Sequence, residues 1–142
     1  MFCLVSRYHG GAFVVFSGTL NDNMQVLALE GSYASVIGGA PAAAVVFAGE
    51  VARRAGEDPR VRRVADRLDG AAGPERGGLQ AEYDETYARV RSDVLGQVAA
   101  EFDAVHSIER ARDVGSVHRI ITAARLRPEL IAAVERGMES AR

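Results

Sequence analysis

Two glycine pairs, each beside a dense apolar run, are the residues whose types and spacing could do chemistry. Gly10 and Gly11 stand in "RYHGGAFVVFSG" (7–18), and Gly38 and Gly39 stand in "SVIGGAPAAAVVF" (35–47). Glycine adopts backbone conformations that other residues avoid, and it lets a ligand approach the main chain. A Gly-Gly-Ala turn at the start of a helix leaves N–H groups free, and two such groups can stabilise an oxygen that gains negative charge. Close packing in a tight turn is the alternative explanation.

The other side chains offer weaker catalytic sets. His9, His106 and His118 are scattered, and none has a serine or cysteine partner at a known motif spacing. His9 is the strongest of the three candidates because it directly precedes Gly10. Cys3 is the only cysteine, so an internal disulfide is excluded and no metal site is expected.

Length and charge narrow the class of protein. A chain of 142 residues indicates one domain. The formal net charge of −2 gives no electrostatic reason to expect binding to nucleic acid or to a membrane surface. No apolar run reaches the roughly 20 residues that a membrane-spanning helix needs. The single cysteine fits a reducing compartment, so a cytoplasmic location is expected.

The elements that must position the glycine pairs lie in residues 1–55, which are apolar and rich in glycine. Strands are expected at 24–31 and 32–38, where β-branched residues gather. A helix is expected over 38–56, because Pro41 suits a first turn and Gly56 suits a C-terminal stop. Segment 11–18 fits either a strand or a short helix that opens at Ala12.

The remainder of the chain has a different pattern. Residues 56–78 read as a loop-rich connector around a short helix at 59–68, and residues 79–142 have mostly helical periodicity. A long helix is expected over 79–105, with a possible break near Ser92. Ser107 should cap a short helix that Gly115 closes, and a short strand should follow. A final helix is expected over 127–142, with an apolar face of Leu130, Ile131, Val134 and Met138.

Taken together, these stretches resemble the C-terminal half of a biotin-dependent acyl-CoA carboxyltransferase, most of all the carboxyltransferase subunits of acetyl-/propionyl-CoA carboxylases. The Gly-Gly-Ala turn, the Asn-Asp-Asn-Met segment (21–24) and the Ser-Val-Ile…Ala-Ala stretch (35–43) occur in matching order. Residues 81–138 resemble the tail of that family, and "ARDVGSVHRII" (111–121) is similar to the wider crotonase superfamily. The resemblance covers nearly the whole chain.

The resemblance implies an α/β fold of the ClpP/crotonase type, with repeated ββα units and a helical C-terminal part. Residues 1–142 would form a single carboxyltransferase C-terminal-type domain. Within it, 1–55 would be the β/α core with the oxyanion turn, 56–78 the connector and 79–142 the helical part.

The same resemblance implies carboxyl transfer from carboxybiotin to the α-carbon of an acyl-CoA. The biotin is carried on a separate carrier protein, and none is bound covalently to this chain. In this family the C-terminal half supplies the oxyanion hole for biotin, so the amides of Gly11 and Ala12 would face the ureido oxygen and Gly10 would permit the turn. Val14 falls where relatives place a residue that helps choose the acyl chain. Gly38 and Gly39 match the start of the helix beneath the biotin pocket, with either a ligand-binding or a packing role.

The implied partners are an acyl-CoA substrate, a biotin carboxyl carrier protein with its biotin carboxylase subunit, and an N-terminal carboxyltransferase half. The active site in this family lies between the N-half of one subunit and the C-half of another. The chain alone is therefore expected to be inactive, and its apolar surface favours a homo-oligomer. Two alternatives stay open, which are a non-catalytic truncated homologue or oligomerisation module and a crotonase-like acyl-CoA hydrolase or isomerase.

Overall fold

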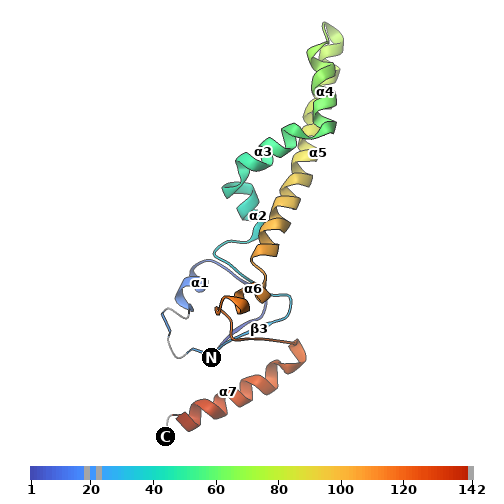
Figure 1. Ribbon diagram of the computed structural model, residues 1–142. Helices are drawn as coiled ribbons and strands as arrows, with labels where there is room; N and C mark the ends of the chain where they lie inside the picture. The colour runs from blue at the N-terminus through green and yellow to red at the C-terminus, as the bar shows by residue number, and fades with distance from the viewer. Residues whose placement is uncertain (18–19, 22–23, 141–142) are drawn as a thin grey trace. The chain divides into compact units, whose positions relative to one another are not determined.

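A computed structural model describes residues 1–17, 20–21 and 24–140 (Figure 1). The chain forms two compact units. The first unit is Met1–Gly38 with Asp103–Arg142, and the second is Gly39–Phe102. These boundaries differ from the expected divisions after residues 55 and 78. That the whole chain is one carboxyltransferase-type domain stays a prediction.

The expected repetition of strand, strand and helix is present, with one complete repeat and the two strands of the second in the first unit, while the helix of the second repeat, α2, belongs to the second unit. Equivalent strands of the two repeats pair in parallel, with Phe2 opposite Val26 in one sheet and Arg7 opposite Tyr33 in the other. A further strand, β5, pairs in parallel with β3, so the larger sheet has the order β1-β3-β5. The elements in chain order are β1 (Phe2–Leu4), β2 (Arg7–Tyr8), α1 (Gly11–Val15), β3 (Val26–Leu29), β4 (Tyr33–Ala34), α2 (Gly39–Pro41) and, later, β5 (Arg119–Ile121).

Several strand predictions need correction. The strand predicted at 24–31 is confirmed as β3, but the one predicted at 32–38 is only the two residues of β4. The chain bends after β4 because the Ser35 hydroxyl donates a hydrogen bond to the carbonyl of Ile37. The sequence left a strand or a short helix open for segment 11–18. Among its described residues, Gly11–Val15 form the helix α1. β1 and β2 were not predicted, because strands of two or three residues are too short to show alternation.

The core of the first unit lies between the larger sheet and α6 (Ile108–Asp113). The predicted cap is confirmed, since the Ser107 hydroxyl accepts a hydrogen bond from the N–H of Arg110. Gly115 follows with a φ of 81°, a conformation that favours glycine. The buried apolar residues of this core are Leu4, Val26, Ala28, Ile108, Ala111 and Val117.

The last helix, α7 (Leu126–Ser140), follows a 3-10 turn at Ala123–Arg125. It is anchored by the buried carboxylate of Glu129, which accepts hydrogen bonds at 2.7 and 3.0 Å from the guanidinium of Arg119. Arg119, helped by Arg125, lowers the pKa of Glu129. The predicted helix is confirmed as far as residue 140, while residues 141 and 142 lie outside the described residues, and its apolar face is exposed. That face comprises Leu130, Ile131, Val134 and Met138.

The second unit is a helical hairpin in which α3 (Ala48–Glu57) and α4 (Pro59–Asp69) pack against α5 (Pro74–Val105). The helix predicted over 38–56 is confirmed as three successive helical segments, with five residues of π-helix at Ala42–Val46 between α2 and α3. α5 has no break at Ser92, and it begins five residues earlier than the helix predicted over 79–105. The hairpin core contains Ala43, Val51, Ala55, Val61, Val90, Val94 and Val98.

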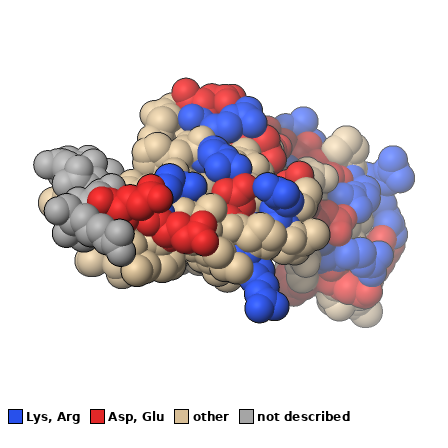
Figure 2. Space-filling model, turned by 90° about the horizontal axis from the view of Figure 1, so that it is seen from below, with Lys and Arg blue, Asp and Glu red and all other residues tan. Residues whose placement is uncertain are grey.

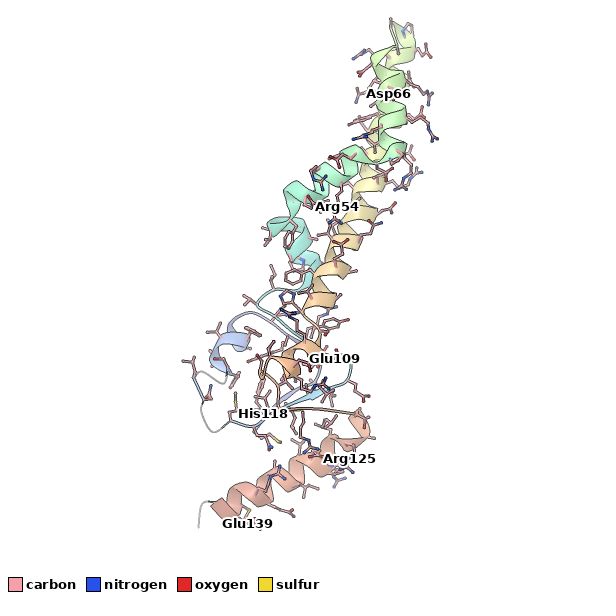
Figure 3. The ribbon with its side chains drawn as sticks, viewed as in Figure 1. Arg54, Asp66, Glu109, His118, Arg125 and Glu139 are labelled. Carbon is pink, nitrogen blue, oxygen red and sulfur yellow. The ribbon has the colours of Figure 1, made fainter. Side chains whose placement is uncertain are left out.

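Ion pairs hold the hairpin in an antiparallel register. Arg54 of α3 pairs with Glu101 at 2.8 Å (Arg54 is labelled in Figure 3), and Arg67 of α4 pairs with Glu82 at 2.7 Å. Figure 2 shows acidic and basic side chains interspersed over the face in view. The arginines at 53, 54, 60 and 67 all have carboxylate partners, which is typical of a solvated helical surface. No helix among the described residues joins the length and the apolar character that a membrane span requires.

Acid should lower the stability of the second unit because it protonates the carboxylate of Glu50. Its carboxylate accepts hydrogen bonds from Arg53 and Arg54, which lower its pKa from 4.5 to about 2. A carboxylate with a lowered folded-state pKa contributes stability above its ordinary pKa, and this contribution disappears as the pH falls through the folded-state pKa. In urea unfolding followed by circular dichroism, Glu50→Gln should be less stable than wild type at neutral pH and should converge with it toward pH 2. Glu139→Gln, at an exposed carboxylate with no ion pair among the described residues, is the control. Parallel pH curves for wild type and Glu50→Gln would contradict this expectation.

Candidate active site: the Gly-Gly-Ala turn

The turn lies between β2 and α1, in the first unit. Gly10 has φ 68° and ψ −143°, a combination that is essentially restricted to glycine. Its N–H donates a 2.8 Å hydrogen bond to the carbonyl of Val36, so the turn is fixed to the segment that follows β4. Gly11 is the first residue of α1, and a Cβ added there would meet open space. The special backbone is therefore required at Gly10 and not at Gly11.

Two backbone N–H donors are available at this turn. The amides of Gly11 and Ala12 belong to the first turn of α1, where no intrahelical acceptor exists. Neither amide donates a hydrogen bond to any group in the described part of the chain. The next amide, that of Phe13, donates to the carbonyl of Gly10 at 3.1 Å. Gly10, Gly11 and Ala12 are exposed, so an acceptor from outside the chain can reach both donors.

Aromatic side chains pack around the turn and helix α1. The Tyr8 hydroxyl donates a 2.8 Å hydrogen bond to the carbonyl of Ala12, and burial raises the pKa of this phenol. The ring of Tyr8 also packs on Phe13, with 5.3 Å between centroids, while Phe16 stacks on Phe2 at 4.8 Å. Sequence reasoning missed these supporting residues, although the aromatic residues flanking the glycine pair were a visible signal. They fix α1 on the strands and thereby fix the direction of its first N–H groups.

Two cavities lie beside α1. The larger, of about 470 Å³, is lined by Tyr8, Phe13 and Phe16 together with residues near Ser116. The smaller, of about 170 Å³, lies next to it and shares Phe13, Val114 and Ser116. Neither is lined by Gly11 or Ala12. These two cavities therefore do not enclose a ligand at the amides of Gly11 and Ala12.

The remaining predicted site residues lie in different settings. Val14 is on α1 and is 54% exposed. Gly38 packs against His9, since a Cβ added to Gly38 would lie 3.3 Å from Nε2 of that imidazole. Gly39 is buried at the start of α2, in the other unit. The structure therefore brings Gly38 together with the Gly10 turn, while Val14 shares only the short helix with Gly11 and Ala12.

Part of the Asn-Asp-Asn-Met segment lies outside the described residues, namely Asp22 and Asn23. Asn21 is described, and its side-chain amide donates hydrogen bonds to the carbonyls of Val15 at 2.8 Å and Ser17 at 3.1 Å. The first contact satisfies the carbonyl of Val15, the last residue of α1, which has no partner within the helix, and the second joins Asn21 to the residues just after the helix. Asn21 therefore stabilises the helix that carries the two free amides.

The strand–strand–helix repetition, the parallel pairing of equivalent strands and the glycine turn between β2 and α1 give an α/β fold, which is similar to that of a solved structure. A solved structure of transcarboxylase 12S, described as a hexamer and a multienzyme core with methylmalonyl-coenzyme A and methylmalonic acid bound, is similar to this chain with a TM-score of 0.50 and 18% sequence identity. The similarity covers 94% of this chain and 19% of that one, so this chain spans about a fifth of the length of its structural neighbour. No protein-family model matches the chain, and no curated protein matches it.

Substitution of the two glycines of the turn should have opposite consequences. Gly10→Ala places a Cβ on a backbone that only glycine adopts easily, and such strain costs about 1–3 kcal/mol. Gly11→Ala places a Cβ in open space on a helical backbone and should leave the free energy of unfolding unchanged or slightly higher. Urea unfolding of both variants beside wild type measures the difference. Equal free energies of unfolding for the two variants would show that the Gly10 conformation is not required.

Proposed function

We propose that this chain provides the biotin-side half of a carboxyltransferase active site, with the amides of Gly11 and Ala12 as its oxyanion hole. The observation that carries the proposal is the pair of adjacent N–H groups without an acceptor among the described residues. The fold and the order of the sequence motifs support the same assignment.

The proposed reaction is carboxyl transfer from carboxybiotin, held on a separate carrier protein, to the α-carbon of an acyl-CoA of the acetyl-/propionyl-CoA type. Carboxybiotin supplies the carboxyl group, and its ureido oxygen gains negative charge as that group leaves. The amides of Gly11 and Ala12 donate hydrogen bonds to this oxygen, and Gly10 sets their direction. Preorganised donors of this kind lower a barrier because they need no reorientation during the reaction.

The substrate side of the site is proposed to come from another polypeptide. An N-terminal carboxyltransferase half would bind the acyl-CoA, and a biotin carboxyl carrier protein with its biotin carboxylase subunit would deliver the carboxyl group. Val14 is proposed to contact the acyl group, and Gly38, which lies beside His9 and the Gly10 turn, is proposed to border the biotin pocket. The chain alone is proposed to be inactive, because the half that would bind the acyl-CoA belongs to another polypeptide.

The proposal is tested by reconstitution. The purified chain is mixed with the N-terminal half of an acetyl-/propionyl-CoA carboxyltransferase, and transfer of ¹⁴C from carboxyl-labelled malonyl-CoA to biocytin is measured. Transfer should need both polypeptides. Formation of the complex without transfer would favour the non-catalytic alternative, and cleavage of acyl-CoA thioesters by the chain alone would favour the hydrolase alternative.

The exposed apolar face of α7 favours an oligomerisation module as the second candidate function. The same face supports association of copies of this chain whether the chain is a carboxyltransferase half or an oligomerisation module. Ile131, Val134 and Met138 are each more than half exposed on one face of this helix. Sedimentation equilibrium should give a mass above the 15.1 kDa of one chain. The double variant Ile131→Glu/Val134→Glu should sediment as a monomer, because a charge on each side of the contact opposes burial. A wild-type chain that sediments as a monomer at every concentration would contradict a homo-oligomer.

A further inference from the structure

His9 joins the Gly-Gly-Ala turn to the segment that leads to the second glycine pair. Its Nδ1 lies 3.1 Å from the backbone oxygen of Ser35 and 3.2 Å from the hydroxyl oxygen of the same residue. The Ser35 hydroxyl in turn donates to the carbonyl of Ile37. The other edge of the imidazole lies against Gly38, where a Cβ would be 3.3 Å from Nε2. A single half-buried side chain, next to Gly10 in the sequence, therefore contacts both Ser35 and Gly38 in the segment that follows β4.

The hydrogen bonds define which nitrogen of the ring carries the proton. The backbone oxygen of Ser35 can only accept, so Nδ1 of His9 must be the donor in that bond. The hydroxyl of Ser35 directs its proton to Ile37 and cannot also donate to the imidazole. In the neutral ring, Nε2 then presents a lone pair, and this buried atom has no hydrogen-bond partner among the described residues.

Filling space in the fold does not by itself explain this arrangement. A buried acceptor without a donor is destabilising, and a phenylalanine ring of similar shape would fill the same space without that cost. The feature that phenylalanine cannot supply is the directional bond from Nδ1 to Ser35. Two backbone hydrogen bonds flank this one. The N–H of Ser35 donates to the carbonyl of Tyr8, and the N–H of Gly10 donates to the carbonyl of Val36. The imidazole is therefore placed to fix the position of the Gly-Gly-Ala turn relative to residues 35–38, which follow β4.

We propose that His9 is a positioning residue for the oxyanion turn, which it aligns through the hydrogen bond from Nδ1 to the Ser35 carbonyl. This inference rests on the proposed function, because it assigns to the Gly11 and Ala12 amides the binding of a ureido oxygen. His9 itself touches no substrate. Gly38 belongs to the same arrangement, because a Cβ at this position would lie 3.3 Å from Nε2 of His9 and would push the imidazole aside.

Three variants of the full chain separate the hydrogen bond from the bulk of the ring. His9→Phe keeps the ring and removes the donor, whereas His9→Asn places an amide N–H near the position of Nδ1 and keeps the donor. His118→Phe is the matched control, because His118 (labelled in Figure 3) also bonds to the backbone of a neighbouring segment, accepting from the N–H of Val26 at 3.0 Å. Hydrogen exchange of the free variants and of wild type is followed in ¹H–¹⁵N correlation spectra, and each protein is then titrated with biocytin.

His9→Phe should speed hydrogen exchange of the Gly10 N–H, which donates to the carbonyl of Val36, and should weaken biocytin binding about tenfold, within the range of one lost hydrogen bond. His9→Asn should restore both properties, and His118→Phe should change neither. The inference is overturned if His9→Phe leaves the exchange rate of the Gly10 N–H where the control has it, or if His9→Asn behaves like His9→Phe. A wild-type chain whose Gly11 and Ala12 resonances do not respond to biocytin contradicts the proposed function instead, while the exchange rates in the free variants still decide the positioning role.

Discussion

Gly11→Pro should lower kcat for carboxyl transfer in the reconstituted enzyme by about 100- to 1,000-fold, which is the usual effect of deleting one oxyanion donor. Proline has no backbone N–H, so this variant removes the donor of Gly11. Gly11 is the first residue of α1, and the first helical position is where proline is best tolerated. The amide that is lost makes no hydrogen bond within the described residues.

The matched control for this variant is Gly11→Ala, which adds a Cβ in open space and keeps the N–H. It should retain a kcat close to that of wild type. Circular dichroism should show that both variants are folded, and sedimentation should show that both bind the N-terminal half. If the proline variant transfers carboxyl groups as fast as the alanine variant, the amide of Gly11 has no part in the reaction.

Ile108→Ala should lower the free energy of unfolding of the first unit by about 2–5 kcal/mol, as expected for a large cavity in a core. Ile108 is 0% exposed and is one of the largest fully buried side chains. It belongs to the cluster that packs α6 against the sheet, with Leu4, Val26 and Ala28. Small domains are stable by only about 5–15 kcal/mol in total, so this substitution would remove a large share.

Ile131→Ala makes the same change at a position on α7 that is 51% exposed. Its effect should be within about 0.5 kcal/mol when measured below the concentration at which copies associate. Both variants are compared by urea unfolding with near-ultraviolet and far-ultraviolet probes. Equal losses at the two positions would mean that the cluster around Ile108 does not stabilise the first unit.

The sequence indicated those elements whose ends are marked by local chemistry. Ser107 and Gly115 define both ends of α6, and Pro59 defines the start of α4, so these boundaries were predictable. β1 and β2 were not predictable, because their pairing depends on contacts with residues about 25 positions later in the chain. The π-helical turn before α3 also leaves no signature in the alanine-rich sequence, since alanine suits every helical form.

The candidate site was predictable in part. The glycine pair at residues 10 and 11 pointed to an unusual backbone, and the structure has that backbone at Gly10 alone. The contact between His9 and Ser35 was not predictable, because 26 residues separate them and only the pairing of β2 with β4 brings them together. The packing of Gly38 on the imidazole follows from the same pairing. This packing explains why the first residue of the second glycine pair, Gly38, has no side chain.

The most direct measurement for the central claim is a comparison of biotin with 2-iminobiotin as ligands for the ¹⁵N-labelled chain. 2-Iminobiotin replaces the ureido oxygen with nitrogen, so the strong acceptor is lost while the bicyclic ring and the side chain remain. The account predicts that biotin moves the amide proton resonances of Gly11 and Ala12 downfield, as new hydrogen bonds do, and that 2-iminobiotin does not. Identical shifts with both ligands, or shifts confined to other residues, would contradict the claim that these two amides bind the oxygen.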